Sequence, residues 1–335
     1  MTLLSEAPHG LTDGPRDVDP GLTTQDRIFR RSVWSVGMFV LVLTGAIGIY
    51  LGYQMIPTIR HYGFSFFTET QWLPEQDKVG VAAVVIGTIE VAIIALMIGF
   101  PLALFTALFI TEYAPSWFKG WLVALVDLMA AVPSIIYGLW GVALLQPRAA
   151  LFARWLSQYF GWIPFFKPND DPNAAVVSLS NFEASAFIAG IVVAMMVIPI
   201  ACSVMRGVFA QAPLGEREAA YALGATRWGM VRTVVLPFGR GGIIGGTMLG
   251  LGRALGETIA VLLIISPRPE IKFRVLTTGT DTISALIAGR FAESTSTQLT
   301  ALLAAGFVLF VITLAVNTIA AIFVGRSRSG AALEI

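Results

Sequence analysis

Charged side chains are scarce in this chain of 335 residues: they make up 13%, against roughly 25% in soluble domains. Hydrophobic residues reach 56%, and the mean hydropathy is +0.76. A soluble fold would have too little charge to cover its surface, so this composition indicates that lipid solvates most of the chain. The net charge of +1 argues against a nucleic-acid binder, which needs a basic patch or stripe.

Cysteine and histidine are nearly absent. The single cysteine, Cys202, excludes an intrachain disulfide framework and a Cys-rich metal site, and we expect it to be a small apolar packing residue. The two histidines, His9 and His61, are far apart and form no ligand cluster. The phosphate-cradling motif GxxxxGK(S/T) is also missing. We therefore expect no metal site, no cofactor and no ATP hydrolysis in this chain itself.

Long apolar runs predict an all-α polytopic membrane protein. About 20 apolar residues suffice to cross a bilayer. The second run contains Pro101 and is longer than one crossing needs, which predicts a tilted or kinked helix. Residues 1–25 are typical of a mobile cytoplasmic tail without a signal-peptide pattern, and residues 26–330 are the expected membrane domain. The six predicted spans are 34–56, 81–111, 121–145, 184–205, 241–266 and 299–324.

Arginines orient these spans, because cytoplasmic segments carry an excess of Lys and Arg. Arg27, Arg30 and Arg31 precede the first span, and five more arginines lie between the fourth and fifth spans. Basic residues also occur on the opposite side, so the bias is modest. It places both termini in the cytoplasm and leaves three outer loops. The first holds Trp72, Pro74 and the charged residues Glu75, Asp77 and Lys78, the second is at about 146–183 and the third at about 267–298.

The cytoplasmic segment 213–237 has a distinctive order of residues. Three residues separate Glu218–Ala219–Ala220 from Gly224, and nine more separate Gly224 from Val234–Val235–Leu236–Pro237. This order predicts two short helices at an elbow, with the first preceded by Pro213 and Gly215. Gly224 can adopt the left-handed conformation that ends a helix, Thr226 can cap the second helix, and Pro237 stops it. An amphipathic hairpin lying on the membrane surface would fit the same composition.

Four ionisable residues lie inside predicted spans: Glu90, Asp127, Arg253 and Glu257. Each costs about 2.5–3.5 kcal/mol near the centre of a helix on insertion scales, so each needs a compensating role. The i, i+4 spacing of Arg253 and Glu257 predicts that they share a face and pair. Two interpretations stay open: a neutralised pair that only stabilises packing, and an arginine on a pathway that binds an oxyanion, with Glu257 holding it in place.

Glycines surround this pair. Gly242, Gly246 and Gly250 recur at four-residue spacing, as do Gly252 and Gly256. Small residues at that spacing let another helix approach closely. The fifth span is therefore expected at the centre of a bundle or at a dimer interface.

The third span contains a proline among polar residues. Pro133 frees a backbone carbonyl, and Asp127 and Ser134 are expected two turns apart on one face. A structural kink and a gate are equally compatible with this pattern. Glu90, in the outer half of the second span, is interpreted as an interhelical hydrogen-bonding partner rather than a substrate ligand.

These segments resemble a known family. The order of residues in 213–237 matches the EAA loop, the ATPase-docking element of ABC importer permeases, with Val in place of the usual Ile. Segments 101–115, 132–138 and 252–258 resemble the phosphate-specific PstC family of permease subunits. The resemblance covers about 30–326 and implies a type I ABC importer permease fold that forms half of a phosphate pathway.

The resemblance also implies roles and partners. It places Arg253 and Glu257 on the phosphate path, to which the chemistry of the third span adds Asp127 and Ser134 as candidates. It implies a second homologous permease (PstA-like), an ATPase dimer (PstB-like) that binds the ATP, and an extracytoplasmic phosphate-binding protein (PstS-like). The residues expected to couple to the ATPase are Glu218, Ala219, Ala220, Tyr221, Gly224, Leu236 and Pro237.

Several alternatives remain at this level. The chain could be the paired PstA-type permease, or a permease for sulfate, molybdate or phosphonate, because an arginine does not by itself separate tetrahedral oxyanions. A secondary transporter or a membrane-embedded enzyme would work without an ATPase, and copurification from native membranes distinguishes them. A purely structural subunit would tolerate loss of Arg253 once Glu257 was also neutralised.

Overall fold

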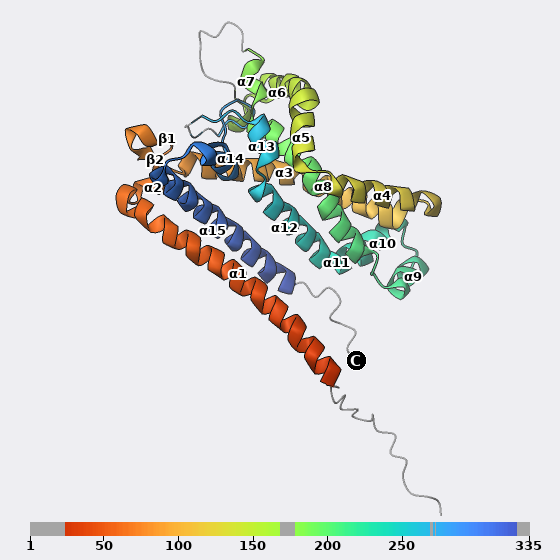
Figure 1. Cartoon of the computed structure of the whole chain (residues 1–335). Coiled ribbons are helices and arrows are strands. Elements are labelled where there is room, and N and C mark those ends of the chain that lie inside the picture. The colour runs from red at the N-terminus through yellow and green to blue at the C-terminus, as the bar shows by residue number, and fades with distance from the viewer. Residues whose placement is uncertain (1–23, 168–177, 269–270, 272, 327–335) are drawn as a thin grey trace, which may run out of the picture. The chain divides into compact units, whose positions relative to one another are not determined.

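The computed structural model describes residues 24–167, 178–268, 271 and 273–326, and the fold is given for these residues (Figure 1). All but the last two residues of the predicted tail at 1–25 lie outside them. The chain divides into two units between Ile49 and Tyr50, within helix α1 (Thr24–Tyr62). The contacts and sites described below lie in the second unit.

The described residues are largely helical, as predicted, and five helices or continuous helical runs are long and apolar enough to cross a membrane. A sixth span results if the segment 227–238 and helix α12, which meet at a bend of 68°, are taken together. The five are α1, the run 82–113 formed by α3 (Ala82–Leu108) and the π-helix η2 (Phe109–Tyr113), the run 134–160, α8 (Ala186–Phe209) and α15 (Ser296–Arg326).

Helix α3 runs through Pro101 without ending there. An irregularity that was not predicted begins eight residues further on, where Ala114 N donates to Phe109 O at 2.8 Å and closes a π-turn. A π-turn holds one residue more than an α-turn, and such turns are frequent at functional sites. The end of the second span, residues 109–113, is therefore a candidate functional segment.

The core is built around α8, whose side chains are mostly buried against α3 and α12 (Arg240–Gly256). The predicted glycine face is the contact between α12 and α8: a Cβ added at Gly246 would lie 3.0 Å from Ala201 O and 3.2 Å from Met205 Cγ. Gly242 and Gly250 meet α8 side chains in the same way. Of the two expected settings, this places these three glycines inside the bundle. The close approach expected at Gly252 and Gly256 is not found: a Cβ at Gly252 would meet only Asn317 Oδ1, at 3.7 Å, and one at Gly256 would meet nothing within 4 Å. Cys202 is fully buried here, consistent with a packing role.

The predicted third span is divided rather than kinked. Helix α4 (Ser116–Ala131) ends before Val132, which is extended at φ −66° and ψ 128°, and α5 (Ser134–Trp140) begins after Pro133. A proline disfavours helical backbone at the residue before it, which explains the end at Ala131. The run then continues through η3 (Gly141–Leu145) and α6 (Gln146–Phe160).

The predicted fifth span is divided as well. Helix α12 ends at Gly256, Glu257 is extended at ψ 127°, and α13 (Ile259–Ile264) follows. The 241–266 segment is therefore two helices, and residues on either side of Glu257 do not share a helical face.

Short elements complete the described chain. The first outer segment is an antiparallel pair of strands in which Trp72 faces Val79 and Leu73 faces Lys78. These elements are α2 (Ser65–Thr68), β1 (Trp72–Leu73), η1 (Pro74–Gln76), β2 (Lys78–Val79), η4 (Pro164–Phe166), α7 (Ser180–Glu183), α9 (Leu214–Ala222), α10 (Arg227–Met230), η5 (Val231–Val235), α11 (Leu236–Phe238), α14 (Ile283–Arg290) and η6 (Phe291–Glu293).

Candidate translocation site and coupling loop

The second halves of the two divided spans pack against each other. Gly138 of α5 allows this contact: a Cβ there would lie 2.9 Å from Ala260 Cα and 2.8 Å from Leu263 Cδ1. Because only a glycine permits such a close backbone approach, α5 and α13 are held together directly beyond both breaks. The two interruptions of helix are thus parts of one site.

Arg253 lies in the last turn of α12, just before the second break. Its Nε is buried without a hydrogen-bond partner, and no carboxylate of the described residues forms an ion pair with its guanidinium. It is close enough to Tyr137 of α5 for its charge to act on the phenol. A cation within a membrane span and without a counter-ion is costly, so this half-buried group is suited to receive an anion.

Glu257 does not pair with Arg253, and the predicted i, i+4 pair is wrong. The helix ends between the two residues, which turns the carboxylate toward α13, where its Oε1 accepts a hydrogen bond from Ala260 N at 3.5 Å. The backbone oxygen of Glu257 accepts a 2.7 Å bond from Ser284 Oγ. Glu257 is 8% exposed and stabilises the break rather than the arginine.

Asp127 and Ser134 do not share a helical face either, because the break at Pro133 separates them. Asp127 belongs to α4 and binds α8, accepting from Ser203 Oγ at 3.1 Å and from Arg206 Nη2 at 3.4 Å. Ser134 opens α5, one turn before Tyr137. Only Ser134 of these two therefore lies beside the paired breaks.

Glu90 does not make the hydrogen bond expected of it, since its buried Oε1 has no partner. It lines a small pocket together with Asp281, in the loop that precedes α14. Burial raises the pKa of Asp281 to about 6, although its carboxylate accepts a 2.7 Å bond from Thr282 N. These two carboxyls form a second polar cluster, between α3 and the third outer loop.

The coupling segment 213–237 forms the two predicted short helices. Gly224 has φ +80°, the left-handed conformation expected of it, and Thr226 Oγ1 accepts from Gly229 N at 3.1 Å as the predicted cap. Helix α9 already begins at Leu214, so Gly215 lies inside it rather than before it. The segment leaves four apolar side chains exposed: Leu214, Tyr221, Leu223 and Trp228.

One buried contact of this segment was not anticipated. Arg217 of α9 donates to Glu112 Oε2 at 3.0 Å and to Phe209 O at 2.6 Å. Glu112 lies in the π-helix η2, 105 positions earlier, and is 5% exposed. The sequence offered one indication that Glu112 matters: it lies in the segment 101–115, which resembles the family but to which no role was assigned.

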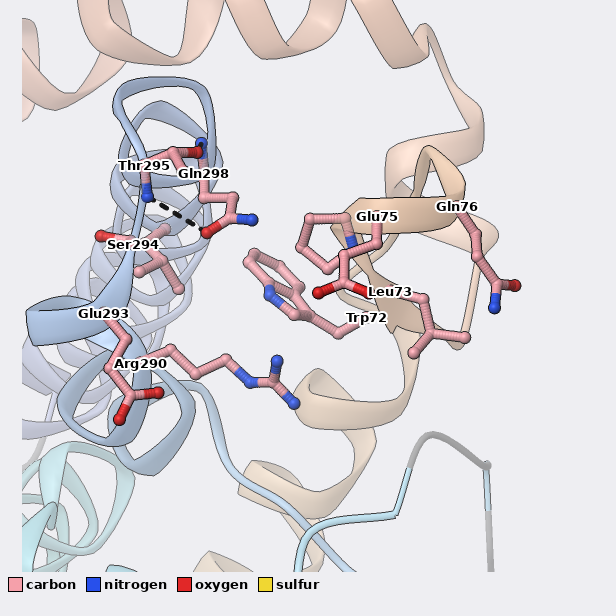
Figure 2. A pocket seen from close by; sticks show the side chains of 11 residues that line it. Trp72, Leu73, Glu75, Gln76, Arg290, Glu293, Ser294, Thr295 and Gln298 are labelled. Carbon is pink, nitrogen blue, oxygen red and sulfur yellow. Dashed lines mark hydrogen bonds between the residues drawn. The ribbon is translucent and has the colours of Figure 1, made fainter.

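A cavity of about 460 Å³ lies between the first predicted outer loop and the start of α15. Figure 2 shows Trp72 and Glu75 on one side of it and Arg290, Glu293 and Gln298 on the other. Gln298 accepts a hydrogen bond from Thr295 N at 3.1 Å. Both charge signs line this cavity, which does not by itself select an anion.

Comparison with known proteins defines the class of this chain. Residues 99–329 match the family described as "Binding-protein-dependent transport system inner membrane component". The chain belongs to this family, and it is therefore a membrane component of a transport system.

Individual relatives narrow the comparison and confirm the resemblance inferred from the sequence. A phosphate transport system permease protein PstC 2 from Mycobacterium tuberculosis is 40% identical over 309 residues, which cover 91% of this chain and 93% of the relative. A PstC protein from Xylella fastidiosa is 38% identical over 317 residues, 94% of each chain.

The fold also has a solved counterpart. A chain in the crystal structure of a bacterial ABC transporter involved in the import of the acidic polysaccharide alginate matches with a TM-score of 0.57. The alignment covers 90% of this chain and 96% of that one at 20% identity. The shared fold confirms the predicted ABC importer architecture.

Proposed function

We propose that this chain is a permease subunit of an ATP-driven phosphate importer and forms half of its translocation pathway. The observation that carries the proposal is the unpaired guanidinium of Arg253 beside the two broken spans. The relatives that share 38–40% of their residues with this chain are phosphate transport permeases by name. The names of these relatives suggest phosphate as the substrate, and the chemistry of Arg253 explains how phosphate could be bound.

The chemistry suits a tetrahedral oxyanion. A guanidinium offers several N–H donors in a planar fork that matches two phosphate oxygens at once. Arg253 makes no ion pair within the described residues, so binding an anion would not require breaking one. Ser134, at the start of α5, is a candidate neutral partner, while Glu257 maintains the break. Asp127, engaged with Arg206, is not retained as a pathway residue.

Labelled phosphate uptake tests this role. Cells whose only copy is wild type, Arg253→Ala or Arg253→Lys are compared at matched membrane abundance, with sulfate and molybdate as competitors. We expect Arg253→Ala to lower uptake by roughly 10- to 100-fold, the effect of losing a hydrogen bond to a charged group. Arg253→Lys keeps the charge but loses the fork, and is expected to fall in between.

The matched control is Arg148→Ala, because Arg148 is exposed on α6 and bonds only Leu144 O of its own helical run, at 2.9 Å. Normal uptake by Arg253→Ala would overturn the pathway role of the arginine. Wild-type uptake competed by sulfate or molybdate as strongly as by phosphate would overturn the substrate assignment.

We also propose that the segment 213–237 docks a separate ATPase, which binds the ATP that this chain cannot. The exposed apolar residues of α9 and the elbow support this, since Leu223 is 89% exposed and Leu214 is 69% exposed. Exposed apolar side chains on a short helix suit a groove on a protein partner. Glu218 is exposed beside them and is available for a polar contact at the rim.

Copurification of the ATPase tests the docking surface. Leu223→Glu places a charge in the proposed apolar contact and should abolish retention of the ATPase. Gln211→Glu places the same charge in the preceding turn, where Gln211 bonds only Gly207 O, and should not. Equal retention of the ATPase by both variants would contradict the docking proposal.

The remaining expectations follow from this arrangement. Both termini would lie in the cytoplasm with the arginine-rich segment 213–237, in accordance with the positive-inside rule. A second, homologous permease would complete the pathway, and an extracytoplasmic phosphate-binding protein would deliver the substrate to the outer loops. The cavity between Trp72 and Arg290 is a candidate contact for that protein.

A further inference from the structure

The coupling helix α9 is attached to the membrane helices at one buried polar point. Arg217, the residue before Glu218, reaches inward between the ends of two spans. Its neighbours Glu216 and Glu218 are exposed, as is most of the coupling segment. The side chain of Arg217 is only 18% exposed, and that of Glu112 is 4% exposed. This contact is therefore the desolvated part of an otherwise solvated element.

Arg217 connects three segments through one guanidinium. Nη1 donates to Glu112 Oε2 at the end of the second span, and Nη2 donates to Phe209 O at the end of α8. The ring of Phe209 in turn lies directly against Gly239, at the bend where α12 begins. Helix α12 carries Arg253 at its other end, so a displacement of α9 reaches the second span directly at Glu112 and the start of the fifth through Phe209 of α8.

A second, weaker contact runs in parallel. The guanidinium of Arg227, at the start of α10, lies over the ring of Tyr113 at 5.1 Å from its centroid. Tyr113 is the residue after Glu112, and both belong to the π-helix η2. The π-turn thus presents one residue to each of the two short helices of the coupling segment.

The geometry of the ion pair suits a flexible contact, referred to below as the joint, better than a rigid one. A single hydrogen bond joins the guanidinium to the carboxylate, whereas an arginine can form two parallel ones. Glu112 Oε1 and Arg217 Nε are both buried without a partner. One bond fixes the distance between the groups and leaves their relative angle free, while burial makes complete separation costly.

We propose that Glu112 and Arg217 are positioning residues that transmit movement of the docked ATPase from α9 to the second and fifth spans. This inference rests on the proposed function, because it presupposes an ATPase on α9. It assigns to the pair a role in converting hydrolysis into transport, and none in binding the ATPase or phosphate.

The test separates this role from a structural one by restoring stability without restoring the charges. Glu112→Gln alone leaves a buried arginine unpaired and should lower membrane abundance. The double variant Glu112→Met/Arg217→Met replaces both charged groups with apolar side chains of similar volume, and abundance should return, because replacing both partners of a buried pair with apolar residues is often neutral or stabilising.

The readout is phosphate transported per ATP hydrolysed by the full transporter in proteoliposomes. In the double variant we expect this ratio to fall roughly 2- to 30-fold, the range seen for residues that modulate coupling. ATPase retention and basal hydrolysis should stay at wild-type levels. Arg148→Met is the matched control, since Arg148 bonds only within its own helical run.

Two outcomes would overturn the role of the Glu112–Arg217 pair without affecting the proposed function. A double variant with wild-type phosphate transported per ATP would overturn the joint and leave the ATPase and substrate assignments intact. Loss of ATPase retention in the double variant would also overturn it, by making the pair part of the docking surface. Failure of the proposed function would instead appear in wild type, as an absence of ATP-dependent phosphate uptake.

Discussion

The hydroxyl of Tyr137 donates a 2.9 Å hydrogen bond to the carbonyl of Met129, the carbonyl that Pro133 leaves without its helical donor. A residue four positions after the proline thus satisfies the group four positions before it. The bond spans the break between α4 and α5 and stabilises it where a continuous helix would have had an amide. Since Tyr137 also lies near Arg253, the same residue connects the two broken spans.

Tyr137→Phe tests this bond. Removing the hydroxyl leaves the Met129 carbonyl with only a long 3.4 Å contact from Val132 N, and we expect a loss of about 1–3 kcal/mol of stability. Thermal unfolding of the detergent-solubilised transporter measures the effect. Tyr159→Phe is the control, because Tyr159 is 66% exposed on α6. Equal melting temperatures for the two variants would show that the bond contributes nothing.

Gly138→Ala tests the close approach of α5 and α13. The added methyl group would lie 2.9 Å from Ala260 Cα, so the helices must separate, which costs about 1–3 kcal/mol. Gly120→Ala in α4 meets nothing within 4 Å and should be neutral or stabilising. Phosphate uptake at matched abundance should fall only for the first variant. An unchanged melting temperature for Gly138→Ala would show that α5 and α13 can separate without loss of stability, and would contradict the prediction.

Gly224→Ala tests the elbow of the coupling segment. At φ +80° an alanine is strained by about 1–2 kcal/mol, which should loosen the turn between α9 and α10. Gly215→Ala lies inside α9 with nothing within 4 Å, and should be neutral or slightly stabilising. Limited proteolysis of the segment in membranes measures the difference, and faster cleavage is expected for Gly224→Ala alone. Identical cleavage rates would contradict a strained alanine at this position.

Asp281 should make stability depend on pH. Burial raises the pKa of its carboxyl to about 6, above the ordinary value of 3.8, so folding favours the protonated form. The stabilisation is complete below the ordinary pKa and is lost as the pH rises through 6. Asp281→Asn should remove that loss and raise the melting temperature at pH 7 relative to wild type.

Melting temperatures measured from pH 4 to 7.5 test this slope. Asp77→Asn is the control, because a hydrogen bond from His61 holds the pKa of the exposed Asp77 carboxyl below its usual range, so folding does not favour its protonated form. If wild type and Asp281→Asn lose stability in parallel between pH 4 and 6, the buried carboxyl is not responsible.

Predictions from the sequence were correct where the local conformation depends only on neighbouring residues. Gly224 and Thr226 adopt the predicted left-handed turn and cap because these depend on a few neighbouring backbone groups. The glycine face of α12 was predictable for a related reason, since four-residue spacing defines a face whichever helix packs against it.

The predicted pairing of Arg253 with Glu257 failed because it assumed an unbroken helix. The sequence around Glu257 contains no proline to announce a break. The interruption is held by Ser284 Oγ, which binds the Glu257 carbonyl from 27 positions away. Pro133 did predict an irregularity in the helix. The sequence could not distinguish a kink from a complete break, because that depends on which group bonds the Met129 carbonyl that the proline leaves free.

The sequence by itself determined that this is a helical membrane protein of a transport family, because composition is sufficient for the first and short-range residue order for the second. Only the tertiary structure decided which charges meet. It left Arg253 without the expected carboxylate, gave Asp127 to Arg206, and joined Glu112 to Arg217 across 105 positions. Helical spacing can propose partners within one span, but buried charges choose theirs from all the helices that pack around them.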